Sequence, residues 1–428
     1  MKQAIKKKNN SSLRISIKNS SFNLVSAFVA CFIFILEMLI LFGIDTIFFD
    51  EIIAIIGVLL ILYGVFKKDN FSTWILILNI LLFVIGLIPF LFNNYDRNFI
   101  LKLLDFFLTF KFIYWFSGVY IFFKFFRKRI KFNKILNLHN KISRILIICL
   151  AAFESYSYFI NGIDRVALST GFNGSLATFI LILQISNLLQ GIYYKRNKLV
   201  PIIIFNLICI YDIFLTDSST GMIISLVTFL AFFYFYFEIK FRFAIIILAI
   251  LGAFFIYLYY DKIITYFFSE DTARSVLYLN SLKISIMNFP FGIGLSLYGT
   301  AIAGQYYSPL YRDLNFPGIW GLEENGSFLN DAYYPGILGE FGIIGFLIFL
   351  ILIFLIASIF YKRRHYRSLF FVFCLIVPIL ALNVSFNLVN NNLTLLLFIV
   401  LFLVFGRTYY AVGISKSNFK KLYGEGTL

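Results

Sequence analysis

Long apolar runs, separated by short polar connections, dominate the chain from residue 23 to residue 411. Most runs are about 16 to 24 residues long, which is roughly the length that a helix needs to cross a bilayer. The runs fall at 23–43, 50–66, 72–92, 103–123, 145–160, 176–194, 199–214, 222–237, 243–260, 336–360, 368–386 and 393–411. The pattern therefore predicts an all-α, polytopic integral membrane protein with about twelve transmembrane helices.

The composition excludes a water-soluble globule. Of the 428 residues, 61% are hydrophobic and 14% are charged, whereas soluble domains are about 45–50% apolar and about 25% charged. The four cysteines all lie in apolar runs, which predicts packing or lipid-facing residues and no disulfide framework: Cys31, Cys149, Cys209 and Cys374.

The basic residues predict the orientation. Of the 37 Lys and Arg, 29 lie in the two termini and in alternate connections, 7 lie in the other connections and span ends, and Lys111 lies within a span. Because basic connections stay in the cytoplasm, we expect both termini there. The net charge of +16 thus reflects membrane topology and not nucleic-acid binding. The basic, polar start of the chain precedes no small-residue cleavage site, so we expect a cytoplasmic tail and not a signal peptide.

The chain then divides into five segments. These are a cytoplasmic basic tail (1–22), nine spans (23–260), a large extracytoplasmic loop (261–335), three spans (336–411) and a cytoplasmic tail (412–428). The bias toward Lys, Asn, Ile and Phe suggests an AT-rich bacterial genome, and we expect the protein to lie in a bacterial plasma membrane.

The connection at 261–335 is much longer than the others, and long loops in compact folds usually carry function. Within it, apolar residues at helical spacing predict a helix over 275–288 that can lie in the membrane interface. Pro and three Gly in 289–299 predict a turn or a close backbone approach.

Arginines on the outer side are candidates for binding a diphosphate, since the guanidinium offers a planar fork of donors that matches phosphate. Arg274 and Arg312 lie in the long loop, Arg165 lies between the fifth and sixth spans, and Arg97 is a weaker candidate. The alternative for each is an interfacial anchor or an ion pair with a neighbouring acid, namely Asp271, Asp313, Asp164 and Asp96.

Two acids close to the end of the loop are candidate catalytic residues. Asp331 can act as a general base toward a substrate hydroxyl, or simply as a helix cap or solvated acid. Glu340 lies inside an apolar run, where an ionisable side chain is costly, so it faces a polar cavity or a partner. The same argument predicts internal pairs among other ionisable residues of the spans, although the sequence assigns no partners: Glu37, Asp105, Lys111, Glu154 and Asp212.

The two histidines, His139 and His365, lie in basic inner connections, where we expect them to be solvated. This removes histidine catalysis and a histidine-based metal site at the outer face. We expect no metal and no cofactor.

Three motifs follow one another along the chain. Arg274 is followed by Asn288-Phe289-Pro290-Phe291-Gly292-Ile293-Gly294, and Asp331 precedes Gly342-Ile343-Ile344-Gly345 by eleven positions. Their order and spacing resemble the O-antigen polymerase (Wzy-type) and O-antigen ligase superfamily over about residues 200–360.

The resemblance implies a metal-independent glycosyltransferase at the outer face of the plasma membrane. In the polymerases, a growing glycan moves from its polyprenyl diphosphate onto a lipid-linked repeat unit, arginines hold the diphosphates, and a side chain near the end of the loop activates the acceptor. Its partners would be lipid-linked oligosaccharides and membrane lipids, with a chain-length regulator and a flippase as protein partners. The products would be capsule, exopolysaccharide or O antigen.

Two departures from the family pattern matter. The ligases carry His in an H-N-x-Y pattern where this chain has Asp331-Ala332-Tyr333-Tyr334, which favours a polymerase over a ligase. In 215–223, Thr220 stands where many members have Arg, so Arg165 or Arg312 would have to supply that phosphate contact.

A flippase or transporter of lipid-linked oligosaccharides is the main alternative, and a ligase-type transferase is another. Transporters usually show repeat symmetry and short connections. The chain shows no internal repeat, and its single long loop favours an enzyme.

Overall fold

The structure, a computed structural model, is built from helices. It describes residues 23–42, 47–159, 173–194, 199–237, 257, 260, 264, 272–330, 333–361, 368–385 and 391–423. No strand occurs in these residues. The helices are α2 (Leu24–Leu41), α3 (Ile47–Phe66), α4 (Asn70–Leu87), η1 (Ile88–Leu91), α5 (Phe99–Phe126), α6 (Phe132–Phe159), α7 (Asn173–Tyr194), α8 (Leu199–Leu215), α9 (Ser219–Phe237), α12 (Ala273–Met287), α13 (Ala301–Gln305), α14 (Pro309–Asp313), η2 (Phe316–Gly318), α15 (Tyr333–Ser358), α16 (Ser368–Ser385) and α17 (Asn392–Tyr423).

Eleven of the twelve apolar runs coincide with these helices, while the run at 243–260 lies almost entirely outside the described residues. Among the described residues, seven helices are long and apolar enough to cross a membrane, as expected for a multi-pass membrane protein: α2, α4 with η1, α5, α6, α7, α9 and α15. Three further apolar helices, α8, α16 and the first part of α17, are shorter. The number of membrane crossings stays a prediction.

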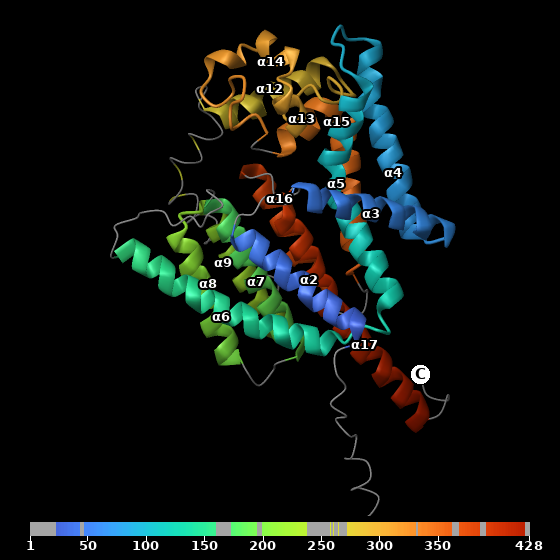
Figure 1. The fold of residues 1–428 in the computed structure, drawn as a ribbon, viewed down its shortest axis with the longest axis vertical. Coiled ribbons are helices and arrows are strands. Elements are labelled where there is room, and N and C mark those ends of the chain that lie inside the picture. Colours follow the sequence, from blue (N-terminus) through green and yellow to red (C-terminus); the bar gives the residue numbers. More distant parts are fainter. Residues whose placement is uncertain are drawn as a thin grey trace, which may run out of the picture.

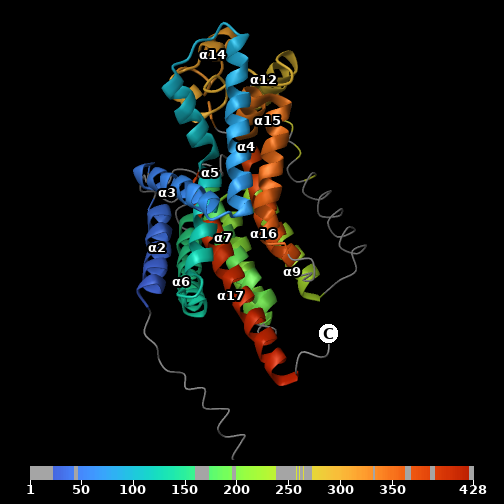
Figure 2. The ribbon, with the colours of Figure 1, turned by 90° about the vertical axis from the view of Figure 1, so that its right-hand side faces the viewer.

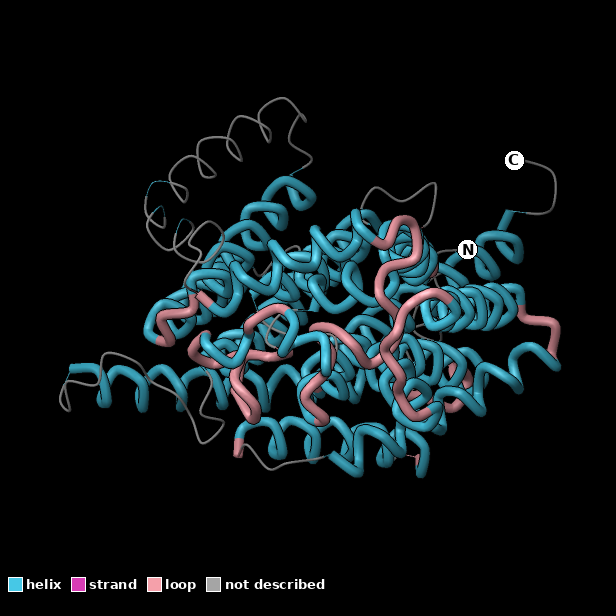
Figure 3. The backbone as a smooth tube through the Cα atoms, turned by 90° about the horizontal axis from the view of Figure 1, so that it is seen from above, coloured by secondary structure: helices cyan, strands magenta, loops and turns pink. Residues whose placement is uncertain are grey.

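The long helices form a bundle, with α12, α13 and α14 gathered at one end (Figures 1 and 2). We call residues 272–330, which include these three helices, the cap. Seen from above, the loops of the cap cross over the helices beneath them (Figure 3). The start of α2 and the end of α17 both lie on the side away from the cap. The location of the two termini relative to a membrane stays a prediction, since residues 1–22 and 424–428 lie outside the described residues.

Close packing inside the bundle rests on small and aromatic residues. A Cβ atom at Gly57 of α3 would lie 2.1 Å from the carbonyl oxygen of Tyr114 on α5, so only glycine permits this helix crossing. Phe116 of α5 packs edge-on against Phe360 and Phe398. These contacts join α5 to the C-terminal helices.

The basic connection that the sequence placed at 126–144 is shorter than expected. α6 begins at Phe132, so most of this stretch is helical. Its polar and apolar residues alternate at helical spacing, which buries Ile135, Leu136 and His139 on one face. This first part of the helix contains no continuous apolar run, because its opposite face is basic.

Candidate functional site

The cap has a hydrophobic core that is separate from the core of the bundle. Tyr298, Tyr311 and Phe316 are fully buried in it, and the ring of Tyr311 stacks on Phe316 with centroids 5.1 Å apart. The Tyr298 hydroxyl donates to the carbonyl oxygen of Leu277 (2.6 Å), and the Tyr311 hydroxyl accepts from the backbone N–H of Gly299 (2.8 Å). Burial raises the pKa of both phenols. The cap is therefore a folded unit in which both buried tyrosine hydroxyls have partners, whereas the buried hydroxyls of Ser285, Ser296 and Ser308 have none among the described residues.

The glycine-rich turn of the cap contacts α15 where that helix is interrupted. Gly342 has φ +62° and ψ −164°, which breaks the helical hydrogen bonds around it. The cap replaces them: Ile293 N donates to Gly339 O (2.8 Å), and Gly294 N donates to Glu340 O (3.0 Å). Backbone groups inside a membrane protein need such partners, because no water is there to supply them.

This contact requires glycine on both sides. Gly292 has φ +74°, and a Cβ atom there would lie 2.5 Å from Gly339 O and 2.6 Å from Gly342 N. A Cβ atom on Gly342 would lie 2.5 Å from Gly292 N. The predicted close backbone approach in 289–299 is confirmed, and the G-I-I-G sequence supplies its other half.

The side chain of Glu340 holds the segment that follows the turn. It is fully buried, and its Oε1 accepts from Leu297 N (2.9 Å), Tyr298 N (3.1 Å) and the Thr300 hydroxyl (3.0 Å). Thr300 in turn caps α13 by accepting from Ala303 N. The sequence expectation that Glu340 faces a partner is confirmed, and the partner is the backbone of the cap.

Asp105 of α5 holds the same segment. Its Oδ2 accepts from Ser296 N at 2.8 Å, and the side chain is fully buried. The carboxyl groups of Asp105 and Glu340 also interact directly. Two carboxyl groups that approach each other are costly to bury when both are charged, so nearby positive charge or a proton on one of them is needed to stabilise the pair.

Arg97, in the connection between η1 and α5, supplies positive charge beside the pair. It is half-buried, and its Nη1 donates to Tyr306 O at 3.2 Å. Burial lowers the pKa of the Arg97 guanidinium, while the nearby Tyr311, Glu340 and Asp105 act in the opposite direction. The positive charge of the guanidinium offsets negative charge on the two acids, which limits the cost of burying them.

The connection before α5 makes two further contacts with the cap. Asn93 Nδ2 donates to Ile293 O at 2.7 Å, and the Tyr95 hydroxyl donates to Asp313 Oδ2 at 2.6 Å. Partial burial, together with the bond to Asp313, raises the pKa of Tyr95 to about 12. The cap is thus held by the connection between η1 and α5, by α5 and by α15 together.

Four further residues were predicted to belong to the site. Two of them, Arg274 and Arg312, lie in the cap, and the other two lie outside the described residues. Arg274 lies half-buried in the first turn of α12, and the exposed Arg312 of α14 lies 3.7 Å from the carboxylate of Glu324. The ion-pair alternative for Arg312 therefore occurs with Glu324. Asp331 and Arg165 lie outside the described residues.

Lys111 and Asp50, which both lie in predicted spans, form an ion pair. Lys111 Nζ lies 2.7 Å from Asp50 Oδ2, which confirms the predicted internal pairing for Lys111. Trp115 Nε1 donates to the carbonyl oxygen of Asp50 at 3.0 Å. The pair joins α3 to α5 below the cap contact.

Glu154 and Asp212 differ from these pairs. They lie on α6 and α8, both are fully buried, and they are close enough to repel each other when charged. None of their four carboxyl oxygens has a hydrogen-bond partner in the described part of the chain.

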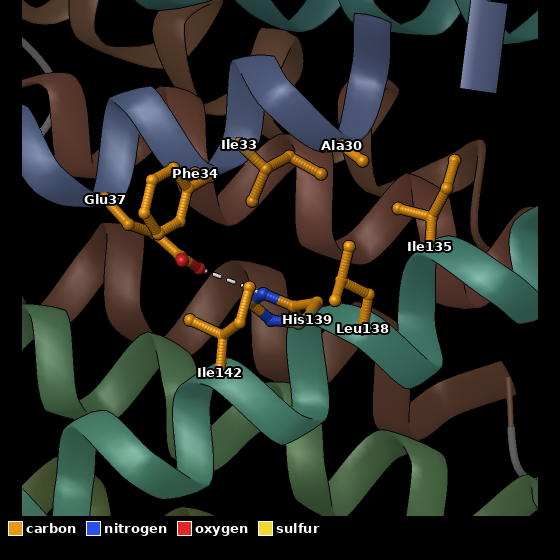
Figure 4. A pocket seen from close by; sticks show the side chains of 8 residues that line it. All are labelled: Ala30, Ile33, Phe34, Glu37, Ile135, Leu138, His139 and Ile142. Atoms are coloured by element: carbon orange, nitrogen blue, oxygen red, sulfur yellow. Dashed lines mark ion pairs between the residues drawn. The ribbon is translucent and has the colours of Figure 1, made fainter. Parts of the chain in front are cut away.

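His139 contradicts the expectation of a solvated inner histidine. It is 3% exposed, its Nδ1 lies 2.9 Å from Glu37 Oε1, and its Nε2 lies 3.2 Å from the Ser186 hydroxyl. Figure 4 shows Glu37 of α2 and His139 of α6 facing each other across a small pocket lined by apolar side chains. The pair thus joins α2 to α6 inside the bundle. His365 lies outside the described residues.

The sequence missed the group formed by Asp105, Glu340 and Arg97. It marked the two acids as unusual because they lie in apolar runs, but pairing of residues so far apart in the chain leaves no local pattern. Arg97 ranked lowest among the outer arginines because it follows Asp96. Its half-buried place beside two acids became visible only in the fold.

No protein-family model matches the chain, and no curated protein matches it either.

Proposed function

We propose that this protein is an oligosaccharide repeat-unit polymerase. It would transfer a growing polyprenyl-diphosphate-linked glycan onto a lipid-linked repeat unit at the outer face of the bacterial plasma membrane, in the biosynthesis of capsule, exopolysaccharide or O antigen. The reaction is a metal-independent glycosyl transfer. A flippase and a chain-length regulator are its proposed protein partners.

The observation that carries the proposal is the contact of the cap with α15. The two motifs of the family resemblance, at 288–294 and 342–345, lie far apart in sequence and are neighbours in the fold. Ile293 N and Gly294 N of the first motif donate to Gly339 O and Glu340 O, just before the second motif, and Ile344 N of the second motif donates to Pro290 O at 3.4 Å. A folded polar cap on an apolar bundle also suits a reaction whose substrates have a lipid tail and a sugar head. Such a substrate places its sugar and diphosphate at the edge of the membrane.

Within this proposal the residues have separate roles. Arg274, Arg312 and Arg165 bind diphosphate, since the leaving group is an anion that needs fixed positive charge. Asp331 accepts the proton of the acceptor hydroxyl. Glu340 is enclosed by three donors and by Asp105, which favours a positioning role for it over the catalytic role that the sequence raised.

The experiment is the size distribution of surface polysaccharide in cells that carry Asp331→Asn or Arg274→Ala. We expect collapse of the long-chain ladder to single repeat units, with normal amounts of protein in the membrane. Asp96→Asn, at an exposed site of the connection before α5, is the matched control and should keep the ladder.

Three outcomes would contradict the proposal. An unchanged ladder in both variants would show that Asp331 and Arg274 are not needed for polymerisation. Single repeat units trapped on the cytoplasmic side, instead of exported, would indicate a flippase. Ladders of normal length that are not joined to their final acceptor would indicate a ligase-type transferase.

A further inference from the structure

The helix α12 of the cap has two different faces. The inward face is buried and includes small polar residues, which let it lie close to α15: Leu277, Ser281, Ile284 and Ser285. The outward face exposes large apolar side chains: Leu279 (39%), Leu282 (50%), Ile286 (68%) and Met287 (82%). Phe289, just beyond the helix, is 68% exposed. An exposed apolar stripe of this kind marks a contact surface.

The stripe continues into the surface of a candidate membrane span. The carbonyl oxygen of Pro290 lies 3.4 Å from Ile344 N, so Phe289 lies next to the turn of α15 that carries Ile343. On α15, the exposed apolar residues recur at helical spacing: Ile343, Leu347, Ile351 and Phe354. The outward face of α12 and this exposed face of α15 therefore form one continuous apolar surface.

The position of α12 along the long axis of the bundle agrees with contact between this apolar surface and lipid acyl chains. In both Figure 1 and Figure 2, α12 lies at the level of the upper part of α4, which is a candidate span. α4 and η1 expose apolar side chains up to Leu91, and Phe92 follows at 83% exposure. If α4 spans the membrane over its whole apolar length, the hydrocarbon core of the bilayer therefore extends to the level of α12.

The single charge on the outward face fits the edge of a bilayer. Lys283 is exposed between Leu282 and Ile286. A lysine can place its stem along an apolar surface while its ammonium group reaches lipid phosphates. Figure 1 also shows α12 running across the long axis of the bundle, the orientation of a helix that lies in the membrane plane.

We propose that α12 is an in-plane membrane helix, with Leu279, Leu282, Ile286, Met287 and Phe289 embedded among the acyl chains of the leaflet nearest the cap. The occupant of this surface is phospholipid. Arg274, in the first turn of the same helix, then lies at the level of the lipid headgroups; its use there for a diphosphate rests on the proposed function, whereas the immersion of α12 does not.

The test measures depth directly. All four native cysteines are replaced, a single cysteine is introduced by Leu282→Cys or Ile286→Cys, and an environment-sensitive fluorophore is attached to the protein in phosphatidylcholine vesicles. We expect loss of fluorescence with spin-labelled phospholipid and little loss with aqueous iodide. Ser327→Cys, at an exposed polar site of the cap, is the matched control and should show the opposite pattern.

A second measurement uses the unmodified protein, in case the labelled variants do not fold. Photoactivatable phospholipid should form adducts on both the 279–289 peptide and the 343–354 peptide. Adducts on 343–354 alone, or iodide quenching at positions 282 and 286 equal to that at 327, would overturn the proposal. Efficient cross-linking of 279–289 to a second copy of the chain would assign the surface to a dimer instead. None of these measurements depends on enzymatic activity.

Discussion

Two buried glutamates in apolar helices, Glu340 of α15 and Glu154 of α6, have opposite surroundings. Both are fully buried. Glu340 accepts three hydrogen bonds from the cap and lies near a guanidinium, whereas neither carboxyl oxygen of Glu154 has a hydrogen-bond partner in the described part of the chain. Sequence reasoning treated them alike, because each is an acid within an apolar run.

The difference shows that burial by itself does not define the role of an intramembrane acid. A buried carboxyl group contributes to the fold when it satisfies donors that would otherwise be unpaired. Glu340 does so for a segment that has no regular secondary structure, 295–300, and therefore fixes the cap. Glu154 satisfies no such group among the described residues, so its removal should cost the fold little.

The largest expected effect is that of Glu340→Leu. The change leaves two backbone N–H groups and the Thr300 hydroxyl without their acceptor, and it removes the carboxyl group that interacts with Asp105 and with the charge of Arg97. We therefore expect a loss of about 3 to 5 kcal/mol of stability. Thermal unfolding of the purified protein in detergent measures the loss. Glu340→Gln is the control, since its amide can accept from the cap and donate to Asp105. Equal melting temperatures for the leucine variant and the wild type would show that Glu340 does not stabilise the fold.

Gly292→Ala should have the next largest effect. The residue has φ +74°, and the new Cβ atom would lie 2.5 Å from Gly339 O, so we expect about 2 to 3 kcal/mol of destabilisation from strain and displaced backbone contacts. Limited proteolysis of the cap would report it. Gly318→Ala, where no atom lies within 4 Å of the added Cβ, should behave as the wild type. Similar digestion of both variants would mean that the turn does not hold the cap.

Tyr95→Phe removes one hydrogen bond at the edge of the cap and should cost about 1 kcal/mol. Because the pKa of Tyr95 is raised to about 12, its hydroxyl stays protonated from pH 6 to pH 9. The difference in melting temperature between variant and wild type should therefore stay constant over that range. Tyr306→Phe, a half-exposed tyrosine of the cap, serves as the control. A difference that changes with pH would contradict the assigned bond.

The smallest effect is expected for Glu154→Leu, the counterpart of the glutamate variant above. Replacement of a buried polar group without partners by an apolar side chain of similar volume is neutral or stabilising. The melting temperature should stay equal or rise. A loss comparable to that of Glu340→Leu would show that Glu154 has an essential partner, and the contrast between the two glutamates would fail.

The apolar runs by themselves determined where the helices form. Length and continuity of apolar residues are local properties, and eleven of the twelve predicted runs are helical in the structure. The glycines and proline of 289–299 likewise indicated a turn or a close backbone approach, because the backbone conformations that these residue types allow are a property of each residue by itself. The amphipathic start of α6 was missed, since the basic residues on one face of that helix interrupt the apolar run.

Only the tertiary structure decided which buried charges meet. The pairs Glu37–His139, Lys111–Asp50 and Asp105–Glu340 each join separate helices, and their partners are set by helix packing and not by spacing along the chain. The kink at Gly342 is similar: its broken hydrogen bonds are acceptable because a distant turn replaces them. A charge or a broken helix is costly alone in an apolar interior, so the sequence could mark these positions, and the fold supplied the partners that make them stable.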